Sequence, residues 1–112
     1  AAAVAVGTAV LRCPESGASQ THKDALADPG FDATVLTRAF TGRYARGLRN
    51  RFLREHDAGA PSGYPALHHL TKPIRAAAAA AGDSSAVNLW AGTGFRAARA
   101  LPLGELLADL EP

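Results

Sequence analysis

The stretch Val4-Ala5-Val6-Gly7-Thr8-Ala9-Val10-Leu11 is the main basis for predicting the fold of this 112-residue chain. Its apolar residues fall on both sides of an extended backbone, as in a buried strand of a parallel sheet that helices cover on both faces. A parallel strand needs hydrogen-bonded neighbours, and the rest of the chain offers few of them. We therefore expect residues 3–11 to be a strand, and we expect the chain to form the last part of a larger α/β protein.

Composition places the chain among globular proteins. Hydrophobic residues make up 47% of the sequence, but much of that share is alanine, which buries little area. Twelve basic and ten acidic residues give a net charge of +2, which is too balanced to predict a polyanionic partner. The single cysteine, Cys13, cannot form an internal disulfide, and no segment has the layout of a membrane span or a signal peptide. These properties predict a cytoplasmic protein that binds neither membranes nor nucleic acid.

Most of the remaining sequence predicts helix. β-Branched residues predict a second strand over residues 33–40. Thr21 is a candidate helix cap, and Pro73 should kink or split the helix that contains it. The predicted helices run over residues 22–27, 45–57, 65–81, 94–100 and 102–110. Two strands separated by one short helix do not make a sheet that covers itself, so the chain is expected to pack against more protein.

Gly7 and Thr8 form the first candidate binding site. A glycine at the carboxyl end of a strand lets a ligand approach the backbone, and exposed N–H groups beside a threonine hydroxyl suit a phosphate. The alternative is a structural bulge or bend in the strand. Trp90, followed by Gly92 and Gly94, is a second candidate because it can line a flat aromatic ligand. The alternative there is a core tryptophan before a loop.

Six arginines within residues 38–54 are the third candidate. They could grip nucleic-acid phosphates, but the balanced charge favours a solvated face and pairing with carboxylates or carbonyl groups. The histidines predict no metal site, because His68 and His69 are adjacent and point about 100° apart on a helix. We interpret the histidines as surface or interface residues, and Cys13 as a small buried residue rather than a nucleophile.

Several stretches, taken in order, resemble the C-terminal third of the nitronate monooxygenases. These stretches are Val4–Leu11, Cys13–Ala18, Leu36–Arg43, Ala45–Arg51 and Asn88–Gly92. The resemblance implies an α/β fold in which this chain supplies the C-terminal part of an FMN-binding TIM barrel and a mostly helical segment of a second domain. It places the late barrel strand, the phosphate turn and the following helix in residues 1–30, and the helical segment in residues 31–112.

The resemblance also implies the residues that bind the cofactor. The family's FMN-phosphate turn, Gln-x-Gly-Thr, aligns with Ala5, Val6, Gly7 and Thr8, which are therefore implied to bind the FMN phosphate. Ala5 replaces the glutamine and Val10 replaces an aromatic residue, but most contacts in such a turn come from the backbone. The family's catalytic histidine would lie before the first residue of this chain, so no catalytic residue is assigned.

The activity that the resemblance implies is FMN-dependent oxidation of alkyl nitronates by O2 to a carbonyl compound and nitrite, within a complete enzyme. The partners would be the small nitronate substrate, O2 and the N-terminal remainder of the barrel. Two alternatives stay open. An NAD(P)H-dependent quinone or enoyl reductase of the same barrel class shares the Gly-Thr turn. A non-catalytic basic helical module would instead use the arginines to bind a protein or RNA.

Overall fold

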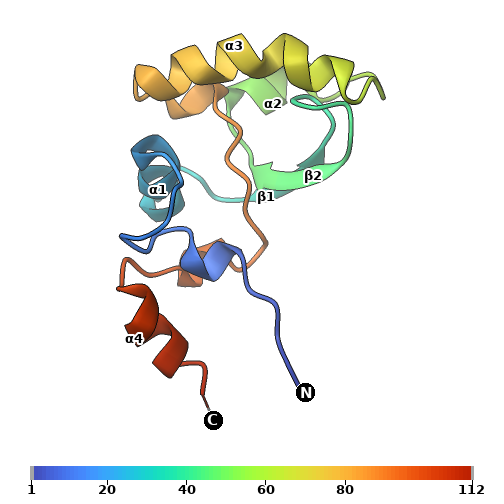
Figure 1. Cartoon of the computed structure of the whole chain (residues 1–112). Coiled ribbons are helices and arrows are strands. Elements are labelled where there is room, and N and C mark those ends of the chain that lie inside the picture. The colour runs from blue at the N-terminus through green and yellow to red at the C-terminus, as the bar shows by residue number, and fades with distance from the viewer. Residues whose placement is uncertain (1, 112) are drawn as a thin grey trace.

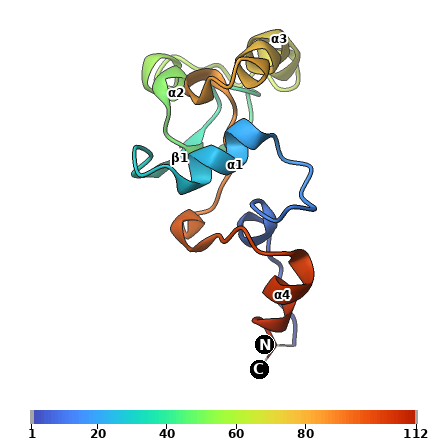
Figure 2. The same ribbon diagram turned by 90° about the vertical axis from the view of Figure 1, so that its left-hand side faces the viewer.

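A computed structural model describes residues 2–111 of the chain (Figure 1). The elements are η1 (Thr8–Val10), α1 (Gln20–Ala27), β1 (Thr34–Thr37), β2 (Ala45–Leu48), α2 (Arg51–His56), α3 (Ala66–Ala80), η2 (Ser84–Ala86), η3 (Phe95–Ala97) and α4 (Leu103–Ala108), where η denotes a 3-10 helix. Helix α3 lies at one end of the molecule, and α4 lies near both termini at the other end (Figures 1 and 2). The segment that follows η2 runs between these two ends.

The two strands form an antiparallel hairpin. Their register runs from the pair Thr34–Leu48 to the pair Thr37–Ala45. Residues 87–92, which we call the C-terminal passage, lie along the other edge of β2 through an isolated bridge between Gly47 and Trp90. Two backbone hydrogen bonds hold that edge: the Leu48 N–H donates to the Leu89 carbonyl at 2.8 Å, and the Ala91 N–H donates to the Arg46 carbonyl at 3.1 Å.

Two buried clusters form the core. The larger contains Ala25, Leu26, Leu48, Ala78, Val87, Leu89, Ala91 and Phe95, so it joins α1, β2, α3 and the C-terminal passage. The smaller contains Ala39, Phe40, Leu53 and Ala60. The Phe40 ring stacks on Phe52, with centroids 4.6 Å apart, and meets Trp90 edge-on at 5.7 Å. Aromatic packing therefore connects α2 to the C-terminal passage.

Asn50 is a buried polar residue that joins three segments. Its side-chain oxygen accepts from the Leu53 N–H, which caps α2, and its amide donates to the carbonyl groups of Ser84 and Val87. Burying any of these polar groups without a partner would lower the stability of the fold. Asn50 therefore fixes where α2 begins relative to the C-terminal passage.

The prediction of a strand over residues 3–11 is wrong. Residues 2–6 are irregular and exposed, with Val4 72% exposed, and Thr8–Val10 forms η1. A strand forms only against a hydrogen-bonded neighbour. Within residues 2–111, the strands β1 and β2 pair with each other, so the apolar run at the start of the chain has no sheet to join.

The prediction of a helix over residues 45–57 is wrong in its first half. Ala45–Leu48 is strand β2, because it is paired along both edges, and α2 begins only at Arg51. The second predicted strand is confirmed over Thr34–Thr37. Long-range pairing has overridden the helical pattern that the arginines and leucines of this segment suggest.

The other helix predictions hold with changed boundaries. Helix α1 begins at Gln20, with Ser19 rather than Thr21 as its cap. Helix α3 continues through Pro73, which neither splits it nor ends it. The predicted helix over residues 94–100 shrinks to η3, and that over residues 102–110 is confirmed as α4.

His22 attaches α1 to the C-terminal passage. Its side chain is buried, and its Nε2 atom lies 3.0 Å from the Trp90 carbonyl oxygen. Burial lowers the pKa of His22 below its usual value of 6.5, and the hydrogen bond to Trp90 opposes this shift to a smaller extent. The sequence predicted a surface or interface histidine, whereas the structure buries this one within the chain.

Gly47→Ala is expected to destabilise the protein by about 1–3 kcal/mol, because the new methyl group would push the hairpin away from the C-terminal passage. A Cβ atom at position 47 would lie 2.9 Å from the Leu89 carbonyl oxygen and 3.0 Å from Cε3 of Trp90. Gly59→Ala is the control, because a Cβ atom there meets nothing within 4 Å. Urea unfolding measures both variants, and equal losses would contradict the special role of Gly47.

Burial of His22 predicts that the protein loses stability on acidification. Because the folded state holds the pKa of His22 below 6.5, the unfolded chain takes up the proton first as the pH falls. The free energy of unfolding should therefore decrease below about pH 6.5, until the folded-state pKa is passed. His22→Gln should flatten part of this slope, as measured by urea unfolding between about pH 7 and pH 5.

Thr21→Val is the matched control for that measurement. It removes the hydrogen bond from the Thr21 hydroxyl to the Ala79 carbonyl but no titrating group. It should lower the stability by the same amount at every pH. If His22→Gln leaves the pH slope of the parent protein unchanged, His22 does not contribute to it.

Candidate functional site

The predicted phosphate turn contacts the second segment that the sequence singled out. Thr8 Oγ1 accepts a hydrogen bond of 2.8 Å from the Gly92 N–H, across 84 residues of sequence. A Cβ atom on Gly92 would lie 3.4 Å from the same threonine oxygen, which is van der Waals contact, so the two backbones approach closely here. The structure thus brings the Gly7–Thr8 turn and the C-terminal passage together.

The turn leaves its backbone open to a ligand. Gly7 has φ −124° and ψ −61°, and its carbonyl accepts from the Val10 N–H at 3.1 Å. A Cβ atom at position 7 would meet nothing within 4 Å, so no contact inside the described chain requires a glycine here. Within residues 2–111, the N–H groups of Thr8 and Ala9 donate to no acceptor. An oxyanion is the kind of ligand that such groups bind.

The remaining residues of the predicted turn contribute no polar side chain. Ala5 and Val6 are exposed, and Val6 is 40% exposed. The Thr8 hydroxyl accepts from Gly92, so its own hydrogen stays available to donate. The donors that this turn can offer are therefore backbone N–H groups and one hydroxyl.

Trp90 packs as a core residue on the evidence of its contacts. Its ring lies against the smaller cluster, edge-on to Phe40, and beside the backbone of Gly47. Its carbonyl lies within hydrogen-bonding distance of His22 Nε2. Trp90 is thus held on several sides. It precedes Gly92 by two residues, and Gly92 contacts the turn at Thr8.

Arg49, Arg51 and Arg54 line one cavity together with Asp28, whereas the other three arginines of residues 38–54 lie outside it. Each of five makes a contact with a different neighbour within the chain. The contacts are Arg38 with Ser62 and Ala60, Arg43 with the Tyr64 ring, Arg46 with Thr34, Arg49 with Asp32, and Arg51 with Glu55. This arrangement agrees with the predicted pairing of arginines with carboxylates, carbonyl groups and a solvated face.

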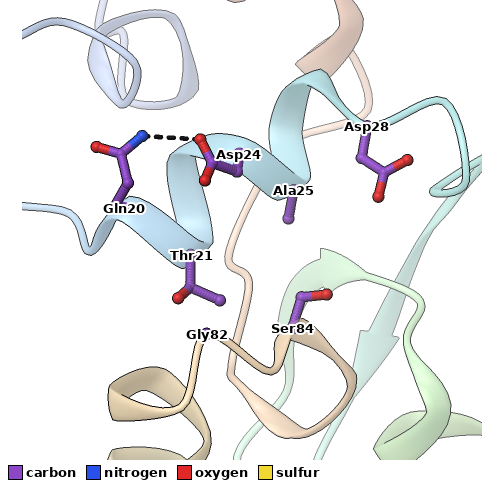
Figure 3. Close-up of a pocket in the computed structure, with 7 residues that line it drawn as sticks. All are labelled: Gln20, Thr21, Asp24, Ala25, Asp28, Gly82 and Ser84. Atoms are coloured by element: carbon purple, nitrogen blue, oxygen red, sulfur yellow. Dashed lines mark hydrogen bonds between the residues drawn. The ribbon is translucent and has the colours of Figure 1, made fainter.

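Three cavities flank α1 within the described residues, and two of them lie toward α3 and the loop that follows it. One, of about 380 Å³, lies between α1 and the loop at Gly82–Ser84 (Figure 3). Its two carboxylates do not form an acid–base pair: Asp24 accepts from the Gln20 amide at 2.7 Å, whereas Asp28 stands at the other end of the helix (Figure 3). The second cavity, of about 330 Å³, lies between α1 and α3 and has His22, Lys72 and Arg75 in its wall.

The sequence analysis did not single out Lys72 or Arg75. The composition of α3 indicates a positively charged helix, because Ala66–Ala80 contains Lys72, Arg75 and two histidines but no acidic residue. Two large apolar residues of α3 are exposed, with Leu70 71% and Ile74 49% accessible, while Thr71 and Ala78 are buried.

The described residues contain no metal-binding group. Within residues 2–111, no three His, Cys, Asp or Glu side chains lie close enough together to hold an ion. Cys13 is buried and carries a free thiol, as predicted. None of the helices in this part of the chain has the length and apolar character needed to cross a membrane.

Sequence comparisons match this chain to known proteins along its whole length. The profile of the nitronate monooxygenase family matches residues 1–112. A nitronate monooxygenase from Pseudomonas aeruginosa is 43% identical over 115 residues, which cover 98% of this chain and 32% of the relative. A probable nitronate monooxygenase from Staphylococcus aureus is 36% identical over 110 residues, which cover 96% of this chain and 31% of the relative.

A solved structure supports the same relationship. A nitroalkane oxidase from Streptomyces ansochromogenes superposes with a TM-score of 0.90 at 60% identity, covering 92% of this chain and 30% of that protein. The chain therefore spans about a third of the length of the relatives that it matches. Because the family profile matches the entire sequence, this chain belongs to the nitronate monooxygenase family.

Proposed function

We propose that this chain is the C-terminal segment of an FMN-dependent enzyme that oxidises alkyl nitronates with O2 to a carbonyl compound and nitrite. Membership of the nitronate monooxygenase family supports the reaction class. The observation that carries the proposal to these residues is the hydrogen bond between Thr8 Oγ1 and the Gly92 N–H. It holds the turn in a fixed position while leaving the donors of the turn free.

Gly7 and Thr8 are the residues that we propose to hold the FMN phosphate. The open side of Gly7 lets a phosphate approach the backbone, and the N–H groups of Thr8 and Ala9 with the Thr8 hydroxyl supply donors. Ala5 and Val6 contribute backbone groups to the same turn. The chemistry that FMN supplies when bound is transfer of electrons from the nitronate to oxygen. We assign no catalytic residue to this chain.

The rest of the barrel is the proposed partner of the end that carries α4. Leu106 is buried, whereas Leu103, Leu107 and Leu110 on the same helical stripe are 36%, 48% and 47% exposed. Val4 is 72% exposed, and the first segment of the chain runs near α4 (Figures 1 and 2). Covering these residues would bury apolar area and place hydrogen-bonding neighbours beside the irregular residues 2–6, which precede η1.

We propose a division of the chain into two segments that agrees with this partner. Residues 1–30 would supply a late barrel strand, the phosphate turn and the following helix, and residues 31–112 would supply a mostly helical segment. The hairpin β1–β2 is part of that second segment, so it is not purely helical. The N-terminal remainder would supply the other strands of the barrel.

The reaction is tested by product analysis on the full-length protein. Nitrite release with oxygen consumption from an alkyl nitronate is the expected result. NADH consumption with a quinone, and no nitrite from the nitronate, would instead support the reductase alternative of the same barrel class. Flavin absorbance in the purified protein tests the cofactor separately from the substrate.

Gly7→Val in the full-length protein is expected to weaken FMN binding by at least about tenfold, because the side chain would fill the open side of the turn. The fold should be unaffected, since a Cβ atom there meets no atom of the chain within 4 Å. Gly17→Val is the matched control, at another glycine with open space. Titration of flavin fluorescence measures both, and an unchanged dissociation constant for Gly7→Val would reject the turn as the phosphate site.

Thr8→Val is expected to weaken FMN binding by roughly ten- to a hundredfold. The substitution removes one charge-assisted hydrogen bond, which contributes about 1.5–3 kcal/mol, and it also removes the acceptor of the Gly92 N–H. Thr8→Ser keeps the hydroxyl and should restore binding. If the serine variant binds FMN as poorly as the valine variant, the hydroxyl is not the group that matters.

Residues 1–112 expressed alone are expected to fold marginally and to associate through residues 3–11. The exposed Val4 and Val6 belong to an apolar, uncharged segment that can pair with a second copy. The double substitution Val4→Lys/Val6→Lys should reduce association, as measured by sedimentation velocity. A cooperative thermal transition from a monomer in dilute solution would contradict this expectation.

A further inference from the structure

We infer that the cavity between α1 and α3 is a binding site for a small molecule that carries a phosphate or carboxylate group. Its polar wall consists of Ser19, His22, Lys72, Arg75 and Asn88. The site uses other residues than the Gly7–Thr8 turn, and the inference does not depend on FMN or on the oxidation of nitronates.

The positive charge of this cavity has no carboxylate to balance it. Lys72 and Arg75 line it, and no acidic side chain does. Helix α3 itself contains no Asp or Glu. Within residues 2–111, neither of these two cations forms an ion pair, whereas Arg49, Arg51 and Arg99 each do. An anion that enters the cavity would therefore meet unpaired positive charge.

The environment of His68 reports the same positive field. Desolvation is the main cause that lowers the pKa of His68, and the further causes are the charges of Arg75, His69 and Lys72. Arg75 and Lys72, the two cations among these neighbours, also line the cavity. This agrees with the absence of any acidic residue along α3.

Arg75 is held in place rather than free in solvent. Its Nε atom donates to Thr71 Oγ1 at 3.1 Å, and its Nη2 atom donates to the His68 carbonyl at 2.7 Å. The Nη1 atom has no partner within the described residues. A guanidinium fixed in this way loses little conformational entropy when it binds an anion.

Neutral donors add to these charges. Ser19, the cap of α1, lines this cavity, whereas Gln20 and Thr21 line the neighbouring one. The Ser19 hydroxyl accepts from the His22 N–H, so its own hydrogen can be donated. The half-buried Asn88 side chain has no hydrogen-bond partner within residues 2–111 and can donate its amide.

The size of the cavity limits its ligand. A volume of about 330 Å³ lies at the lower end of the range for small-molecule sites, which is about 300–1,000 Å³. Inorganic phosphate or a short carboxylate fits this space together with a small organic group.

The test is calorimetric titration of the full-length protein, saturated with FMN so that any flavin-phosphate site is filled. Inorganic phosphate and succinate are the probes, in a buffer free of other polyvalent anions. We expect at least one of them to bind with a stoichiometry of one. Lys72→Gln should weaken that binding by about tenfold, because it removes a charged hydrogen-bond donor from an exposed position.

Asn88→Asp is a second variant of nearly unchanged shape. It places a carboxylate in the cavity and should abolish binding of the same probe. Arg54→Gln is the matched control, because it removes one positive charge from α2 at a different cavity, which Arg49 and Arg51 also line. Thermal unfolding of each variant checks that it is folded.

Three results would overturn the inference. The first is that neither probe binds to the folded parent protein. The second is that Arg54→Gln and Lys72→Gln weaken binding equally, which would indicate diffuse attraction to the whole surface. The third is that Asn88→Asp binds the probe as well as the parent protein does.

Discussion

Hydrogen bonding along both edges of strand β2 is the constraint on which the rest of this structure depends. One edge pairs with β1, and the other pairs with residues 87–92 through the Leu48 and Ala91 N–H groups. Gly47 makes the second contact possible, because any larger residue would meet the Leu89 carbonyl and the Trp90 ring. A segment far along the chain is thereby held next to a hairpin that forms locally.

The C-terminal passage in turn contacts the other elements of the molecule. Its carbonyl at Val87 accepts from Asn50, its carbonyl at Trp90 binds His22, and its N–H at Gly92 donates to Thr8. Val87, Leu89 and Ala91 meanwhile bury their side chains in the larger cluster. The same six residues therefore form part of the core, attach α1 and α2, and fix the turn that we propose to bind the FMN phosphate.

The two ends of the molecule differ in what they offer. The end with α4 exposes leucines beside the first residues of the chain, which suits contact with the remainder of a protein about three times as long. The opposite end carries α3, whose Lys72 and Arg75 form no ion pair among the described residues and whose Leu70 and Ile74 are exposed. In a family oxidoreductase, the first end would complete the barrel, and the cavity beside α3 would take a second, anionic molecule.

The sequence by itself determined the features that arise within one turn or one strand. It indicated α3, α4, strand β1 and the buried Cys13, and the ordered stretches indicated the family. Tertiary structure decided the rest, because strands and buried polar contacts depend on partners distant in sequence. Residues 3–11 have strand character but no strand neighbour within residues 2–111, whereas residues 45–48 have helical character but neighbours on both edges. The contacts of Thr8 with Gly92 and of His22 with Trp90 join positions that no local pattern relates, so only the folded chain brings them together.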